Sequence, residues 1–143
     1  TISRILQNEN WPEVIIIDCP GNMGWLTMNA LLASTEAIFP TLDGSFELQA
    51  LGDFKDTVEE AKTMNPSLNV RGVVLNQYQE NTNISKSMSA AINAMNYPLF
   101  ETRIPRATKL KEAPNNNKPI FLYSPKEKAS KAMVSFIEEV YAI

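Results

Sequence analysis

The chain contains no histidine, a single cysteine and only five glycines in 143 residues. Without histidine there is no Ser/His or Cys/His pair that could activate a nucleophile. Cys19 has no partner for an internal disulfide, which excludes a small disulfide-built scaffold and favours a reducing cytoplasm. No apolar run approaches the roughly 20 residues of a membrane span, and no signal peptide is recognisable. We therefore expect no membrane partner.

The net charge of the chain is small, and its positive residues are concentrated in one stretch. The net charge of −3 argues against binding of nucleic acid by the whole surface. The stretch 101–131 in the last third of the chain is locally basic, because only Glu101, Glu112 and Glu127 oppose its positive residues. These are Arg103, Arg106, Lys109, Lys111, Lys118, Lys126, Lys128 and Lys131.

Apolar runs typical of strands alternate along the chain with segments that have helical spacing. This alternation predicts a mostly parallel α/β sheet with helices on both faces, formed by a single domain over residues 1–143. The expected strands are 14–17, 37–39, 70–75 and 99–104, with a possible short strand at 120–123. The expected helices are 26–34, 46–64, 84–95 and a terminal helix to about 141, and a loop is expected at 106–118.

Several residues define the expected boundaries. Pro40 should halt the second strand, and Asn65-Pro66 should end the longest helix. Ser124-Pro125 has the composition of an N-cap and first turn for the terminal helix. The apolar face expected for that helix consists of Ala129, Met133, Phe136, Ile137 and Val140.

Three candidate site residues follow the expected main strands. Asp18 ends the first, Asn76 follows the strand 70–75, and Pro105 follows the strand 99–104. Because ligands of such sheets bind beyond the carboxyl ends of the strands, these residues should lie at one edge.

A family resemblance rests on several short motifs in a fixed order. Residues 14–20 (VIIIDCP) and 26–31 (LTMNAL) resemble the Walker B and switch II region of the ParA/MinD-type deviant Walker ATPases. The distal signature of that family is similar to the motifs IPR at 104–106, LKEAP at 110–114, KPI at 118–120 and YSP at 123–125. The resemblance implies a P-loop NTPase-like fold, incomplete on its N-terminal side.

The resemblance implies a nucleotide site for ATP and Mg²⁺ in the parent protein. Asp18 would support the magnesium through a water, because this hard cation prefers oxygen ligands and keeps its waters. Pro20 and Gly21 would belong to switch II, which reports the γ-phosphate. Gly21 replaces a second proline of the family and should loosen this turn. Cys19 is expected to be a small buried residue, and an ordinary strand-to-helix loop is the alternative for this segment.

The other side of the implied site would hold the base. Asn76 stands where related ATPases read the adenine edge, with one amide donor and one acceptor. Pro105 and Arg106 would form the other wall of the base pocket. The alternatives are a turn residue for Asn76 and a solvated surface side chain for Arg106.

The resemblance also implies non-specific DNA binding. Lys109 matches an arginine implicated in that binding, and Lys111, Arg103 and Lys86 would extend the basic patch. Phosphate contacts need only positive charge, so lysine can serve. Asn81 replaces a second arginine of some members, and a solvated lysine face is the alternative.

The glycine-rich loop with two lysines that cradles the phosphates in this family has no counterpart among the five glycines. Since the chain opens at Thr1 and in mid-pattern, we expect the C-terminal part of a longer ATPase, which alone neither binds ATP with Mg²⁺ nor hydrolyses it. The implied parent is a cytoplasmic, nucleoid-associated ATPase of plasmid or chromosome partition. It would dimerise with ATP, bind DNA and respond to a ParB-like partner.

Two alternatives remain open. The chain could be a paralogue without a P-loop that acts as a regulatory or dimerisation module, or part of a related ATPase that positions another cargo. An exposed edge of a central strand would favour self-association of the chain. The acidic end of the tail argues against a membrane-binding terminal helix.

Overall fold

The computed structural model describes residues 2–6, 11–42, 47–79 and 83–141, with only the backbone described at 47, 48 and 83–86. The chain divides into two compact units. Unit 1 comprises residues 1–37 and 49–70, and unit 2 comprises residues 38–48 and 71–143. The prediction of a single domain stays a prediction. Within the described part of the chain, no helix has both the length and the apolar character needed to cross a membrane.

Unit 1 contains the helices α1 (Ile2–Leu6), α2 (Trp25–Ala33) and most of α3 (Glu47–Met64). Asn65 ends α3 and also joins it to α2, because its Nδ2 donates to the carbonyl oxygens of Leu31 and Ser34 at 3.0 and 2.8 Å. These carbonyls lie in the last turn and C-cap of α2, where that of Leu31 also accepts from the Ser34 N–H at 3.3 Å. The helices predicted at 26–34 and 46–64 are confirmed over their described residues.

The strand predicted at 14–17 is wrong for this structure. No helix or strand is assigned to residues 11–20, and Val14, Ile15 and Ile16 are 49%, 40% and 85% exposed. A buried parallel strand needs hydrogen-bonded neighbours and cover on both faces. Within the described residues this segment has neither a strand partner nor that cover.

The sheet has three strands in the order β1 (Glu36–Leu42), β2 (Asn69–Tyr78) and β3 (Leu99–Pro105). β2 and β3 pair in parallel, with Val73 beside Leu99 and Leu75 beside Arg103. The prediction that Pro40 halts the first strand is wrong, since β1 continues to Leu42. β1 is an edge strand of the described sheet, where a residue without an N–H is tolerated.

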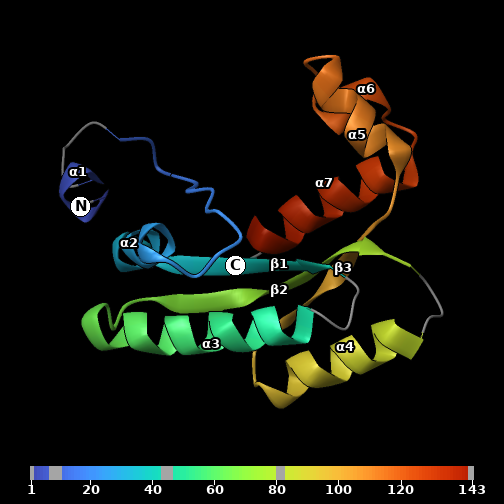
Figure 1. Cartoon of the computed structure of the whole chain (residues 1–143). Helices are drawn as coiled ribbons and strands as arrows, with labels where there is room; N and C mark the ends of the chain where they lie inside the picture. Colours follow the sequence, from blue (N-terminus) through green and yellow to red (C-terminus); the bar gives the residue numbers. More distant parts are fainter. Residues whose placement is uncertain (1, 7–10, 43–46, 80–82, 142–143) are drawn as a thin grey trace. The chain divides into compact units, whose positions relative to one another are not determined.

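In unit 2, α4 (Asn83–Ala94) and α7 (Lys128–Tyr141) contact β3 from opposite faces of the sheet (Figure 1). Helices on both faces, as predicted, are therefore present. One hydrophobic cluster in the core of this unit consists of Val74, Phe100 and Ile104, against which Leu110, Met133, Phe136 and Val140 pack. The rings of Phe100 and Phe136 meet edge to face at 5.1 Å. Ile137, predicted to belong to the packed face of α7, is instead 44% exposed.

The segment before α7 differs most from the prediction. In place of a loop at 106–118 and a strand at 120–123, the structure has α5 (Thr108–Asn115) and α6 (Ile120–Tyr123). α5 forms despite Pro114 because Leu110 packs against the core and Ala113 is buried, so tertiary packing outweighs local propensity. α7 begins at Lys128, so Ser124-Pro125 is not its N-cap as predicted.

The C-terminal turn of α7 is fastened to two strands by side-chain hydrogen bonds. The Glu139 carboxylate accepts from the backbone N–H groups of Glu101 and Thr102 at 2.6 and 3.0 Å. Arg71 Nη2 donates to the carbonyl oxygen of Val140 at 2.8 Å, a favourable place for a cation because the helix dipole is negative there. Glu139 thus supplies β3, an edge strand of the described sheet, with acceptors that a further strand would otherwise provide.

Candidate functional site

The carboxyl ends of β2 and β3 bring together the residues predicted to hold a base. Asn76 pairs with Ile104, and Tyr78 pairs with Pro105. The Arg106 N–H donates to the carbonyl oxygen of Tyr78 at 3.4 Å. Asn76, Pro105 and Arg106 therefore occupy one edge of the sheet, in the arrangement expected for parallel strands. Their roles stay predictions.

The prediction that the strand ends before Asn76 is wrong, because β2 includes Asn76 and continues to Tyr78. The register shifts between Asn76 and Tyr78, and Gln77 has the left-handed φ of 53°. The Gln77 N–H donates to Asn76 Oδ1 at 2.9 Å, which uses one of the two lone pairs of this oxygen. The second lone pair and the amide donors of Asn76 are the groups that a base edge would need.

An open concavity of about 390 Å³ lies in unit 2 next to these strand ends. Its lining residues are Tyr78, Glu101, Arg103, Pro105 and Lys128. The Arg103 guanidinium carbon lies 5.4 Å from the centre of the Tyr78 ring, within the range of a cation–π contact. Tyr78 was not among the predicted site residues, because the expected strand ended before it, and the register shift at Gln77 that positions it has no signal in the sequence.

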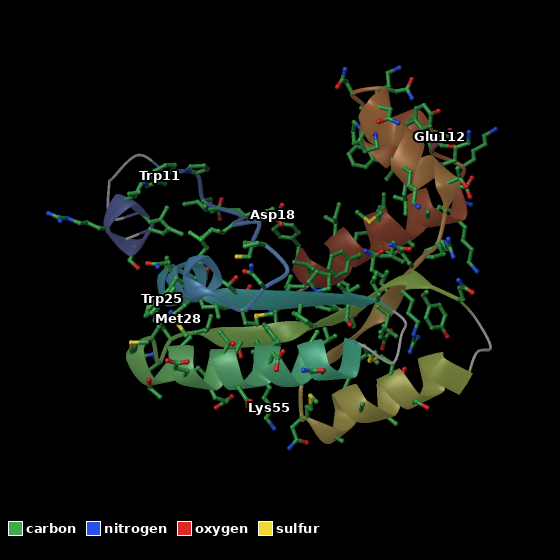
Figure 2. All side chains as sticks on the ribbon, in the orientation of Figure 1. Trp11, Asp18, Trp25, Met28, Lys55 and Glu112 are labelled. Carbon is green, nitrogen blue, oxygen red and sulfur yellow. The ribbon has the colours of Figure 1, made fainter. Side chains whose placement is uncertain are left out.

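The candidate magnesium-facing residue belongs to unit 1. Asp18 is exposed, in the segment without regular structure that precedes α2 (Figure 2). Pro20 and Gly21 are also exposed, and a Cβ added at Gly21 would meet no atom within 4 Å. Cys19 is exposed, so the expectation of a buried residue is wrong, for the same reason that the strand 14–17 is uncovered.

The end of this segment is fixed to the first turn of α2. The buried Thr27 donates from Oγ1 to the carbonyl oxygen of Asn22 at 2.7 Å, and the Met28 N–H donates to the carbonyl of Gly24 at 3.0 Å. Asp18 thus belongs to unit 1, whereas Asn76, Pro105 and Arg106 belong to unit 2.

The predicted DNA-binding residues are distributed over three elements of unit 2. Arg103 lies on β3 and is exposed, and Lys109 and Lys111 lie in α5. Lys86 lies in α4, but its side chain is outside the described residues, as is Asn81. Among the described residues, the ammonium group of Lys111 has no acidic partner within ion-pair distance.

Lys109 is held by a cluster that the sequence analysis did not foresee, composed of Lys109, Glu112 and Tyr123. Lys109 Nζ lies 2.7 Å from Glu112 Oε2, and the Tyr123 hydroxyl donates to the same oxygen at 2.9 Å. The ammonium also lies 5.8 Å from the centre of the Tyr123 ring. The hydrogen bond to Glu112 raises the pKa of Lys109, while the hydrogen bonds from Lys109 and Tyr123 lower the pKa of Glu112. The spacing of Lys109 and Glu112 was a signal for their pairing, whereas Tyr123 reaches them only because α5 and α6 pack together.

Comparison with known proteins gives matches over nearly the whole chain. A family model described as an AAA domain matches residues 3–70. The sporulation initiation inhibitor protein Soj of Bacillus subtilis is 33% identical over 132 residues, which are 91% of this chain and 52% of Soj. The chromosome partitioning protein ParA of Myxococcus xanthus is 31% identical over 130 residues, which are 90% of this chain and 46% of that protein. The chain thus spans about half the length of these curated relatives.

A solved structure extends the likeness to the fold. The septum site-determining protein MinD of Pyrococcus horikoshii, complexed with Mg-ADP, is 27% identical to the chain and superposes with a TM-score of 0.69. The match covers 87% of this chain and 49% of MinD. The parallel sheet with its helices is accordingly the arrangement of a P-loop NTPase.

Proposed function

The chain is related in sequence and in fold to the ParA/MinD-type P-loop partition ATPases, and from this premise we propose that it is part of an ATPase that partitions chromosomes or plasmids. The observation that carries the proposal is the sheet edge at which Asn76, Pro105 and Arg106 meet, in a chain whose matches cover about nine-tenths of its length. Proteins of this kind use ATP with Mg²⁺, which the complex of MinD with Mg-ADP supports.

For the nucleotide, we assign the base side to unit 2. Asn76 combines an amide donor with a carbonyl oxygen that keeps a free lone pair, the pair of groups that an adenine edge requires. Pro105 and the backbone of Arg106 lie beside it across the parallel pairing. A bound base would therefore rest between β2 and the turn after β3.

For the phosphates and the metal, we assign the switch to unit 1. Asp18 would support Mg²⁺ through a water, and Pro20 and Gly21 would lie in the segment that follows the γ-phosphate. Because Thr27 and Met28 bind the end of that segment, a change at the nucleotide would pass directly to α2. When bound, Mg²⁺ would supply charge stabilisation for phosphoryl transfer.

For DNA, we assign a basic surface to Arg103, Lys109 and Lys111, extended by Lys86 on α4. Lys111 and Arg103 are exposed, so their charges can reach phosphates without rearrangement of the fold. We further propose that the parent protein dimerises with ATP, associates with nucleoid DNA and is stimulated by a ParB-like partner.

The base site is tested with Asn76→Ala in the protein expressed from its complete gene. We expect the Kd for ATP to rise about tenfold, since net hydrogen-bond contributions are about 0.5–1.5 kcal/mol each. Asn93→Ala is the matched control, because Asn93 is exposed on α4 and far from the strand ends in sequence. A thermal melt of both variants separates lost binding from lost folding. Equal ATP affinities of the two folded variants would contradict the assignment of Asn76.

The DNA surface is tested with Lys109→Ala. We expect weaker binding to every duplex sequence, and a salt dependence whose logarithmic slope is smaller by about one. Lys62→Ala is the matched control, because Lys62 also pairs with a glutamate three residues away, Glu59 at 3.4 Å, but lies on α3. Lys109→Ala binding with the affinity and slope of Lys62→Ala would refute the assignment.

A further inference from the structure

We propose that Glu112 is an intramolecular competitor that regulates phosphate binding at Lys109. The inference rests on the proposed DNA-binding function and concerns the regulation of the same surface. Glu112 belongs to the motif at 110–114 and Tyr123 to the motif at 123–125. The proposal gives both residues a role in the control of a neighbouring cation.

The geometry shows that Lys109 is already paired. Its Nζ lies 2.7 Å from Glu112 Oε2, the length of a charge-assisted hydrogen bond. Figure 2 shows Glu112 at the part of unit 2 formed by α5 and α6, and both residues lie on α5 one turn apart. A DNA phosphate that approaches Lys109 therefore meets an ammonium whose charge is offset by an adjacent carboxylate.

Tyr123 holds the carboxylate in the competing position. Its hydroxyl donates to the same Oε2 atom at 2.9 Å, and its ring lies 5.8 Å from the Lys109 ammonium. A single oxygen thus accepts from two residues of different helices. Because the aromatic ring and the carboxylate both attract the ammonium group, Tyr123 stabilises the ion pair of Lys109 with Glu112.

The ion pair of Lys109 with Glu112 is exposed enough for a phosphate to replace the carboxylate. The side chains of Lys109 and Glu112 are 45% and 37% exposed, so water and a phosphate oxygen can reach the ammonium. Exposed ion pairs are weak, and one anion can replace another at such a cation. Lys111, two residues along α5, has no acidic partner among the described residues, so the two lysines should respond differently to the removal of Glu112.

The competition should operate at neutral pH. The hydrogen bonds from Lys109 and Tyr123 lower the pKa of Glu112, so its carboxylate is ionised under those conditions. The hydrogen bond to Glu112 raises the pKa of Lys109, so the ammonium is charged as well. Glu127, in the segment before α7, adds to the negative field at Lys109 and acts to raise its pKa in the same direction as Glu112.

The test measures binding of the complete-gene protein, with ATP and Mg²⁺, to a fluorescent mixed-sequence duplex between about 50 and 200 mM salt. The Glu112→Gln variant keeps the shape of the side chain and removes its charge. We expect its Kd to fall about two- to fivefold at the lowest salt, with a logarithmic salt slope steeper by well under about one, because Lys109 makes a single phosphate contact. Glu59→Gln is the matched control, because it removes the same charge from a Lys–Glu pair of equal spacing on α3.

The double variant Lys109→Ala/Glu112→Gln separates local competition from general charge. The proposal predicts that Glu112→Gln gains little once Lys109 is absent. It is overturned if Glu112→Gln binds like Glu59→Gln, or if the double variant gains as much over Lys109→Ala as the single variant gains over the wild type. Failure of the DNA-binding assignment itself has a different signature, an unchanged affinity of Lys109→Ala.

Discussion

Replacement of Glu139 by alanine removes the acceptors that fasten α7 to the edge of β3. Two charge-assisted hydrogen bonds are lost, from the N–H groups of Glu101 at 2.6 Å and Thr102 at 3.0 Å. Each such bond contributes about 1.5–3 kcal/mol when buried. Because Glu101 is exposed and Thr102 half-buried, water can replace part of this interaction, and we expect a total loss of about 1–2 kcal/mol.

This loss should appear in thermal and urea unfolding. For a chain of 143 residues, a loss of 1 kcal/mol corresponds to about 4 °C in Tm, so Glu139→Ala should unfold about 4–8 °C below the wild type. Glu138→Ala is the matched control, since Glu138 is the exposed neighbour on the same helix and its removal changes the net charge equally. Equal Tm values for the two variants would refute the anchoring of α7 by Glu139.

The effect of Glu139 should also depend on pH. Burial of the carboxylate acts to raise its pKa, but the hydrogen bonds from Thr102 and Glu101 outweigh burial, so the pKa of Glu139 lies below its ordinary value. A carboxyl group with a lowered pKa stabilises the fold fully above the ordinary value of about 4.3, and this contribution is lost as the pH falls through the folded-state pKa. The difference between wild type and Glu139→Ala should therefore be constant near neutral pH and shrink in acid; a difference that grows in acid would contradict the reasoning.

Two further predictions concern packing. Gly72→Ala should destabilise the protein by about 1–3 kcal/mol in urea unfolding, because the added Cβ would lie 2.8 Å from the Phe100 ring and 3.1 Å from the Pro98 carbonyl oxygen. The matched Gly52→Ala, whose Cβ meets no atom within 4 Å on α3, should instead stabilise by up to about 1 kcal/mol, and the same sign for both variants would contradict this account. Ile92→Ala should lower the free energy of unfolding by about 2–5 kcal/mol, because this α4 side chain is fully buried; a loss below about 1 kcal/mol would show that α4 is not packed as described.

The sequence predicts the helices and strands whose apolar residues follow a regular spacing along the chain. The helix of residues 47–64 and the strands β2 and β3 follow from continuous apolar or amphipathic patterns, and their parallel pairing brings Asn76 beside Ile104. Residues 14–17 have the same kind of apolar pattern, but they have no hydrogen-bonded neighbouring strand within the described residues. The apolar pattern alone therefore predicted a strand that this structure does not form.

Other features depend on contacts that sequence spacing does not reveal. The proline and asparagines of 114–117 favour a loop, yet α5 forms because Leu110 reaches the core of unit 2. The hydrogen bonds of Glu139 to β3 span 37 and 38 residues, and that of Tyr123 to Glu112 spans 11. Such pairings arise only when the packing of helices on the sheet is known.

The most direct test of the central claim is Mg²⁺-dependent ATP hydrolysis by the protein expressed from its complete gene, with wild type compared with Asp18→Asn. A residue that acts on magnesium through a water should cost about 10- to 100-fold in activity when its charge is removed. We predict turnover by the wild type and a loss of this size in the variant. Absence of turnover in the wild type would contradict the ATPase assignment and favour a regulatory module without a P-loop, whereas undiminished turnover of Asp18→Asn would refute the role of Asp18.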